Sequence, residues 1–128
     1  MISFCAHCWA EIDAREPLCP RCEVDLTGDT RSYEEKLIGA LAHPLPEARA
    51  RVCWLIGENR VCEAVPSLIH LAEHDPDLFV RKGALEALGA FDEPASVTVL
   101  RAVSRTPNRL LARTAWRSLR RIAPSEAG

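Results

Sequence analysis

The chain has 128 residues, of which 27% are charged and 5% aromatic, and its formal net charge at pH 7 is −2. Its apolar runs are far shorter than a membrane span, and its first residues have neither the basic start nor the apolar stretch of a signal peptide. These features exclude a membrane protein, and we expect a cytoplasmic one. Abundant Ala, Leu, Arg and Glu favour helices over sheet.

Two cysteine pairs stand near the start of the chain, Cys5-Ala6-His7-Cys8 and Cys19-Pro20-Arg21-Cys22, separated by ten residues. Each pair places two thiols on a tight turn, and a short hairpin brings the turns face to face around one tetrahedral ion. Four thiolates leave no open position for water or substrate, so the metal would be structural. We therefore predict one zinc ion, with iron left open as the metal in vivo, bound by Cys5, Cys8, Cys19 and Cys22.

The segment from about residue 3 to residue 26 resembles the short zinc ribbons at the ends of many prokaryotic proteins, where Cys-x2-Cys, ten residues and Cys-x2-Cys recur. Those ribbons commonly have Gly after each pair, where positive φ favours the turn, whereas this chain has Trp9 and Glu23. Two alternatives stay open: His7 could replace one cysteine, and the thiols could form a redox pair or disulfides. We expect the ribbon to form a domain over residues 1–28.

From Tyr33 onward the sequence has an internal repeat of 32 residues. Residues 49–57 align with 81–89 and with 113–121, and residues 64–71 align with 96–103. Apolar residues recur at helical spacing in each half of the repeat, and Pro or Gly separates the halves. The pattern predicts six helices and a tail at 123–128, with the helices over residues 33–43, 47–57, 62–74, 78–90, 94–105 and 109–122.

Helix pairs of this period cannot bury their apolar faces alone, so they stack on neighbouring pairs. We predict an all-α fold: a short right-handed α-solenoid over residues 33–122, preceded by a small zinc-ribbon β-hairpin. The stretch 75–89, followed by a short loop, a Pro and an apolar helix, resembles the HEAT-like repeats named for phycobiliprotein lyases. The resemblance implies that Arg49, Arg81 and Arg113 each reach an acidic residue or a helix end in the neighbouring turn.

A solenoid needs covered ends, and the ribbon could cover the first helix. It would pack one or more apolar side chains on that helix, with residues 26–31 as a connector too short to let it move far. Trp9 could instead be exposed for a partner. The candidate packing residues are Phe4, Trp9, Ile12 and Leu18.

Two further cysteines, Cys53 and Cys62, lie in or beside apolar helical patterns and have no partner at metal-ligand spacing. We expect both to be buried small apolar residues. His70 and His74 lie four apart on one helical face with Asp75 and Asp77 nearby. They could form a second metal site or simply a surface pair.

Charge is distributed unevenly along the chain. Residues 1–32 hold three basic and six acidic side chains, residues 33–100 hold six and eleven, and residues 101–128 hold seven arginines against Glu126 alone. The basic end could bind phosphate, nucleic acid or an acidic protein surface, could meet the acidic body of another chain, or could be a solvated helix face. Its members are Arg101, Arg105, Arg109, Arg113, Arg117, Arg120 and Arg121.

The sequence contains no recognisable catalytic arrangement, because its four histidines are scattered and it has no glycine-rich phosphate loop. We therefore predict a non-catalytic protein-interaction scaffold that binds a protein partner. The identity of the partner and the oligomeric state are left open. The alternative is a nucleic-acid-binding accessory protein that uses the Arg-rich last helix, which the acidic bulk of the chain opposes. An enzyme or lyase acting on a bound cofactor is suggested only by the family name of the repeat.

Overall fold

A computed structural model describes residues 1–124. It begins with an antiparallel hairpin of β1 (Ile2–Phe4) and β2 (Glu11–Asp13), in which Ser3 pairs with Ile12. A single 3₁₀ turn, Cys62–Ala64, precedes the third helix. The helices that follow the hairpin are α1 (Tyr33–Ala40), α2 (Pro46–Glu58), α3 (Val65–His74), α4 (Leu78–Leu88), α5 (Pro94–Val103) and α6 (Arg109–Ile122).

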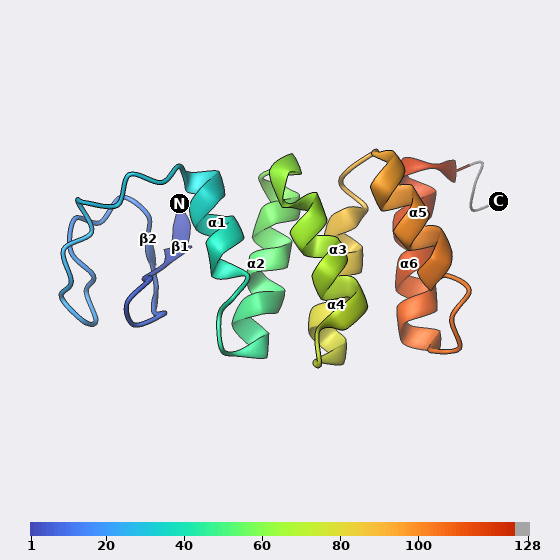
Figure 1. The fold of residues 1–128 in the computed structure, drawn as a ribbon, viewed down its shortest axis with the longest axis horizontal. Coiled ribbons are helices and arrows are strands. Elements are labelled where there is room, and N and C mark those ends of the chain that lie inside the picture. Colours follow the sequence, from blue (N-terminus) through green and yellow to red (C-terminus); the bar gives the residue numbers. More distant parts are fainter. Residues whose placement is uncertain (125–128) are drawn as a thin grey trace.

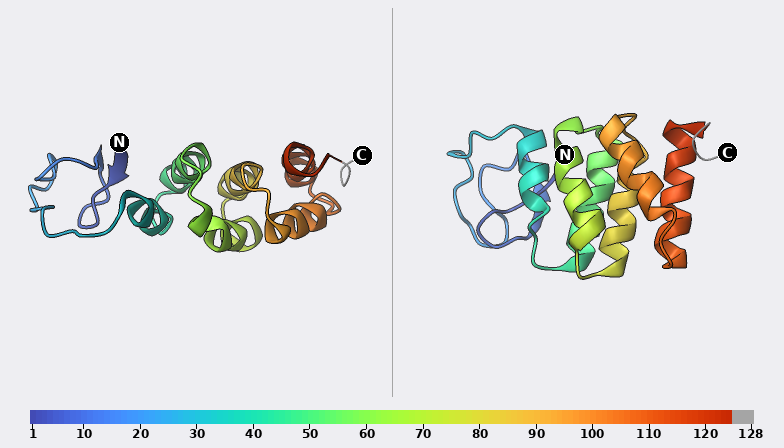
Figure 2. Two further views of the ribbon diagram at one scale, coloured as in Figure 1. Left: turned by 90° about the horizontal axis from the view of Figure 1, so that it is seen from above. Right: turned by 45° about the vertical axis from the view of Figure 1, so that its right-hand side comes forward.

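The helices form an elongated array with the hairpin at one end, as Figure 1 shows. Seen from above, they alternate between two layers, with α1, α3 and α5 in one layer and α2, α4 and α6 in the other (Figure 2). Neighbouring helices contact one another between the two layers and within the layer of α2, α4 and α6. This arrangement confirms the all-α solenoid and the small N-terminal hairpin expected from the repeat and the cysteine spacing.

Local sequence signals explain where the helices begin. Ser32 and Glu35 form a capping box at α1, the side chain of Asp77 accepts the Phe79 and Val80 amides at α4, and Asn108 caps α6. Helices α2, α3 and α5 instead have Pro in their first turn, where its missing amide costs no hydrogen bond. The expected bounds differ most at two helices: α1 ends at Ala40, so that residues 41–45 form a loop, and α3 begins at Val65, after the 3₁₀ turn.

One apolar core runs through the helical array, and one residue of the hairpin belongs to it. Leu37, Ile56, Leu88 and Leu119 are buried in this core, and Phe4 of β1 packs into the same cluster. The hairpin region has a second, smaller core formed by Cys5, Ile12 and Cys19. Within residues 1–124, no helix is both long and apolar enough to cross a bilayer.

Candidate metal centre and interaction surfaces

Four cysteine sulfur atoms lie close together in the N-terminal module. The Sγ atoms of Cys5 and Cys22 lie 3.7 Å apart, as do those of Cys8 and Cys19, and all four atoms lie within 4.8 Å of one another. Four sulfur atoms at ~2.3 Å from one tetrahedral ion would be about 3.8 Å apart, so this set fits a zinc-like ion. The cysteines are free, and their separation is far longer than a disulfide bond of about 2.05 Å.

The two cysteine turns have the same backbone geometry. The Cys8 amide donates to the Sγ atom of Cys5, and the Cys22 amide donates to that of Cys19. Trp9 and Glu23 both adopt positive φ, at 66° and 64°, which is the conformation that Gly commonly supplies in ribbons of this type. The turns therefore form without glycine, at the cost of a strained residue in each.

The electrostatics of the second cysteine turn favour a thiolate at Cys19 alone. A hydrogen bond from the Val24 amide lowers the pKa of Cys22, but burial and hydrogen bonds with the other thiols raise it overall to about 12. Hydrogen bonds donated by the amide of Cys22, and less strongly by that of Arg21, lower the pKa of Cys19 to about 6 against the opposing effect of burial. The thiolate is the form that binds metal. His7 is exposed and does not belong to the group of four potential metal ligands, so it does not take the place of a cysteine.

A buried histidine joins the ribbon to the helices. His43, only 4% exposed, lies in the loop after α1, where its Nδ1 atom accepts the Leu45 amide at 3.0 Å. Its Nε2 atom therefore carries the proton and donates to the Trp9 carbonyl at 2.9 Å. The rings of Phe4 and Trp9 contact the imidazole edge to face, with centroids 5.3 and 5.1 Å from it. Trp9 is thus used in packing between the two modules.

Two further contacts tie the hairpin to the array. The Tyr33 hydroxyl donates to the Ile2 carbonyl at 2.7 Å, and Arg51 of α2 pairs with Glu11 of β2. Of the residues expected to pack on the helices, Phe4 does so, whereas Ile12 lies in the ribbon's own core. The candidate Leu18 does not pack on the helices: it is 53% exposed and lies in the second half of the ribbon, opposite Asp25.

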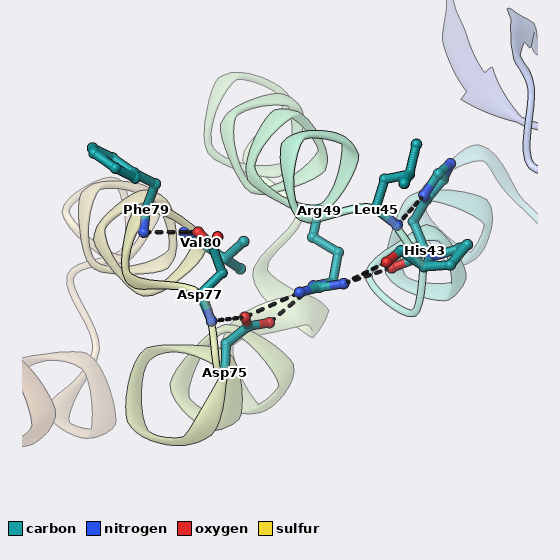
Figure 3. A network of polar contacts seen from close by, with 8 residues as sticks. His43, Leu45, Arg49, Asp75, Asp77, Phe79 and Val80 are labelled. Atoms are coloured by element: carbon teal, nitrogen blue, oxygen red, sulfur yellow. Dashed lines mark hydrogen bonds and ion pairs between the residues drawn. The ribbon is translucent and has the colours of Figure 1, made fainter.

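A polar network continues from His43 into the repeats (Figure 3). The guanidinium of Arg49 binds the Asp75 carboxylate with two hydrogen bonds, of 2.9 and 3.2 Å, and also donates to the His43 carbonyl. The Asp75 side chain is only 3% exposed and accepts the Asp77 amide as well. Since Asp77 caps α4, this chain of contacts connects the loop after α1 with the start of α4.

The repeating arginines have different environments. Arg49 reaches an acidic residue, and the Nε atom of Arg81 donates to the Ala72 carbonyl near the end of α3 at 2.9 Å, as the resemblance implied. Arg113 is exposed, and no hydrogen bond or ion pair joins its side chain to another described residue. Its implied structural contact is therefore missing within residues 1–124.

The Arg-rich end of the array lies mainly on α6. The repeat positions held by the fully buried Ile56 and Leu88 hold Arg120 here, and Arg120 is exposed. Trp116 occupies the repeat position of the buried Val52 and Ala84 but is 41% exposed, so on α6 this position does not lie in the core. No further helix pair within residues 1–124 packs against this side of α6.

The arginines of this end are not equivalent. The guanidinium of Arg120 lies over the Trp116 ring, 4.6 Å from its centroid, and Arg101 on α5 is half-buried. The other arginines of the set are exposed: Arg105, Arg109, Arg113, Arg117 and Arg121. Glu126 and the rest of the expected tail from residue 125 onward lie outside the described residues.

Sequence reasoning missed one exposed face. Helices α2, α4 and α6 enclose a depression of about 570 Å³, and Trp54 and Phe79 on its rim are 57% and 67% exposed. The repeat contained a signal, because the positions equivalent to Trp54 hold Glu86 and Ser118, and those equivalent to Phe79 hold Glu47 and the buried Leu111. Aromatic side chains at these positions are therefore not needed for the repeat to fold.

The remaining cysteines and histidines have ordinary surroundings, with one correction. Cys53 is fully buried, and burial raises the pKa of its thiol to about 12. Cys62 is exposed, so its expected burial was wrong, because it begins a 3₁₀ turn at the edge of the array. His70 and His74 form an exposed pair with ring centroids 5.0 Å apart.

The two carboxylates that could have completed a second metal site beside these histidines are used elsewhere, Asp75 with Arg49 and Asp77 as a helix cap. Among residues 1–124, the four ribbon cysteines form the only group of three or more metal-ligating side chains with this proximity.

Comparison with known proteins agrees with this architecture. The family described as HEAT repeats matches residues 34–120, which is more than half of the sequence. The chain therefore belongs to the HEAT-repeat family, with a four-cysteine module resembling a zinc ribbon before the repeats.

One solved structure with the same fold is the complex of CpcE and CpcF of phycocyanin lyase from Nostoc sp. PCC7120. A chain of that complex matches with a TM-score of 0.64 and 24% sequence identity over 80% of this chain. The match covers 44% of that chain, so this protein spans less than half its length. No curated protein matches the sequence significantly.

Proposed function

We propose that this protein is a non-catalytic scaffold that binds another protein through its HEAT-repeat surface, while the ribbon holds one structural zinc ion. The observation that carries the proposal is the exposure of the two aromatic side chains Trp54 and Phe79 beside one depression of the helical array. Large exposed aromatic residues are typical anchors of protein interfaces. Although its likeness is one of fold, the complex of CpcE and CpcF supports a protein partner as well, since there two proteins assemble.

The ribbon, residues 1–28, is proposed as a structural domain that covers the first helix pair of the repeat array, which spans residues 33–122. Its ligands would be Cys5, Cys8, Cys19 and Cys22, whose geometry suits a closed tetrahedral site. When bound, zinc would hold the two cysteine turns together and would supply no reaction step. Free thiols throughout the described part of the chain suit a reducing compartment, which supports the proposed cytoplasmic location.

Binding of nucleic acid is the alternative function, and the exposed arginines of α6 favour it. The acidic excess over residues 1–100 opposes it, because phosphate repels carboxylates. A protein that binds DNA or RNA through these arginines would lose affinity steeply as salt increases.

The full chain, purified without added metal, should contain one zinc or iron ion per molecule by elemental analysis. Immobilised at moderate salt in extract of its native host, it should retain the same partner protein in repeated experiments. A nuclease-treated extract separates the alternatives, since a protein partner would stay bound whereas one held through nucleic acid would be lost. Absence of any reproducible partner would contradict the scaffold function. Turnover of a bound cofactor would show instead that the protein is an enzyme.

A further inference from the structure

Small residues lie where α2 and α4 contact each other in the layer formed by α2, α4 and α6. A Cβ atom added to Gly57 would lie 3.5 Å from the Cα atom of Ala87, and one added to Gly83 would lie 3.7 Å from that of Ala50. Small residues thus bring the backbones of α2 and α4 close together and leave no large side chain over the contact. The depression of about 570 Å³ lies above this floor.

Large side chains stand around this floor. Trp54 rises from α2 and Phe79 from the first turn of α4, and more than half of each side chain is exposed. A face that combines a small-residue floor with protruding aromatic rings receives large aliphatic side chains from a partner, because each such side chain is then surrounded by apolar atoms.

Charge varies along the same face. Glu58 of α2 lies at one end, the pair of Lys82 with Glu86 occupies the middle, and Arg117 and Arg121 of α6 lie at the other end. The central pair is neutral as a unit, so the α6 end is positive, whereas Glu58 at the α2 end is accompanied by Arg60, whose guanidinium donates to the Ala90 carbonyl of the same lining. A partner segment with acidic residues near one end would be attracted to the α6 end, which would fix its direction.

The secondary structure of the face determines the backbone conformation of its occupant. The depression is lined by residues of three helices and the turn after one of them, and backbone amides and carbonyls inside helices are already paired. An extended peptide would bury its own backbone groups here without partners, whereas a helix satisfies them internally and presents only side chains.

We propose that the face formed by α2, α4 and α6 docks an amphipathic α-helix of a partner protein, which places aliphatic side chains on Trp54 and Phe79 and acidic residues on Arg117 and Arg121. The inference rests on the proposed scaffold function and names its surface and the chemistry of its partner. A polyanion such as nucleic acid suits this face less well, because Glu58 and Glu86 also line it.

Two synthetic helical peptides of about 18 residues, ~27 Å long, test the proposal. Both have leucines at helical spacing along one face; the first has glutamates in its last turn, and the second has glutamines at the same positions. Binding to the full zinc-loaded chain is measured by fluorescence anisotropy. We expect the acidic peptide to bind about tenfold or more tightly than the glutamine peptide, and Trp54→Ala and Phe79→Ala each to weaken it by a similar factor.

A double-mutant cycle isolates the charge contact. In the variant Arg117→Gln with Arg121→Gln, the preference for the acidic peptide should disappear while the leucine contacts persist. Arg105→Gln removes an equally exposed arginine that does not line the depression, and it should leave both affinities unchanged. Circular dichroism of every variant confirms that the helical array is folded.

The proposal would be overturned if the acidic peptide failed to bind, or if it bound with the same affinity to wild type, to both aromatic variants and to the double arginine variant. These failures are distinguishable from failure of the scaffold function. A partner retained from host extract equally by wild type, Trp54→Ala and Phe79→Ala would leave the scaffold standing and exclude this face, whereas no retained partner would contradict the scaffold itself.

Discussion

The Nε2 atom of His43 lies 2.9 Å from the carbonyl oxygen of Trp9, and this contact joins the first cysteine turn to the loop after α1. The same loop accepts hydrogen bonds from Arg49, which is paired with the buried carboxylate of Asp75. The ribbon and the first repeats are therefore connected by an unbroken series of polar contacts, of which Figure 3 shows the part from His43 to the start of α4.

The contacts of the buried His43 side chain predict that it stabilises the docking of the ribbon on the helices. His43→Ala would leave the Trp9 carbonyl and the Leu45 amide without their partner and would remove the ring between Phe4 and Trp9. We expect a loss of about 1–3 kcal/mol in the free energy of unfolding, measured by denaturant titration, and faster amide hydrogen exchange in residues 1–13. His70→Ala, on the exposed face of α3, is the control and should change neither quantity; unchanged exchange in His43→Ala would contradict the docking role.

Removal of the metal should unfold the ribbon and leave the helices. The small core of Cys5, Ile12 and Cys19 is insufficient without the ion, whereas the helical core is continuous from α1 to α6. A strong chelator should therefore abolish exchange protection in residues 1–28 while the helical circular dichroism signal changes little. Cooperative loss of the helical signal on chelation would show instead that the array depends on the metal.

The six cysteines should differ sharply in reactivity. Cys62 is exposed and should react first with a thiol reagent in the zinc-loaded protein. Cys53 is buried with a pKa raised to about 12, so at pH 8 its reactive thiolate is scarce, and its labelling should require unfolding. Mass spectrometry should therefore find one modified cysteine before chelation and five after it. A Cys62→Ser control should show no modification before chelation.

The ion pair of Arg49 with Asp75 should contribute more to the free energy of unfolding than Arg113, which occupies the same repeat position as Arg49. Arg49→Ala leaves a carboxylate that is only 3% exposed without its cation, and such a loss costs about 3–5 kcal/mol. Arg113→Ala is the matched control, because Arg113 occupies the same repeat position but is exposed, and we expect a change within about 0.5 kcal/mol. Thermal or denaturant unfolding measures both; equal effects would mean that the buried pair has no special role.

The strained turn residues predict a stabilising substitution. Glu23 has φ of 64° and an exposed position in the second cysteine turn, so Glu23→Gly should relieve about 1 kcal/mol of backbone strain. Competition with a chelator should show metal held several-fold more tightly. Glu16→Gly, at a position without positive φ, should not strengthen binding, and a weaker metal site in Glu23→Gly would contradict the prediction.

The amino-acid sequence by itself determined the local and periodic features of this protein. The cysteine spacing predicted the four sulfur atoms that lie within 4.8 Å of one another. Each pair forms its own turn, the first between β1 and β2 and the second between Leu18 and Asp25, and the short segment between the pairs keeps the two turns close. The repeat of 32 residues and its Pro and Gly positions predicted six helices with nearly the observed bounds, because helix periodicity and capping act over only a few residues.

Tertiary structure decided what each repeat position faces. Trp116 and Arg120 stand where the earlier repeats have buried residues, and only the absence of a packed neighbour among residues 1–124 leaves them exposed. His43 is separated from Trp9 by 34 positions, and no local pattern marks the pair. The face with Trp54 and Phe79 likewise arises only when α2, α4 and α6 lie side by side. Such relationships depend on distances between segments remote in sequence, which the packing of the whole array sets.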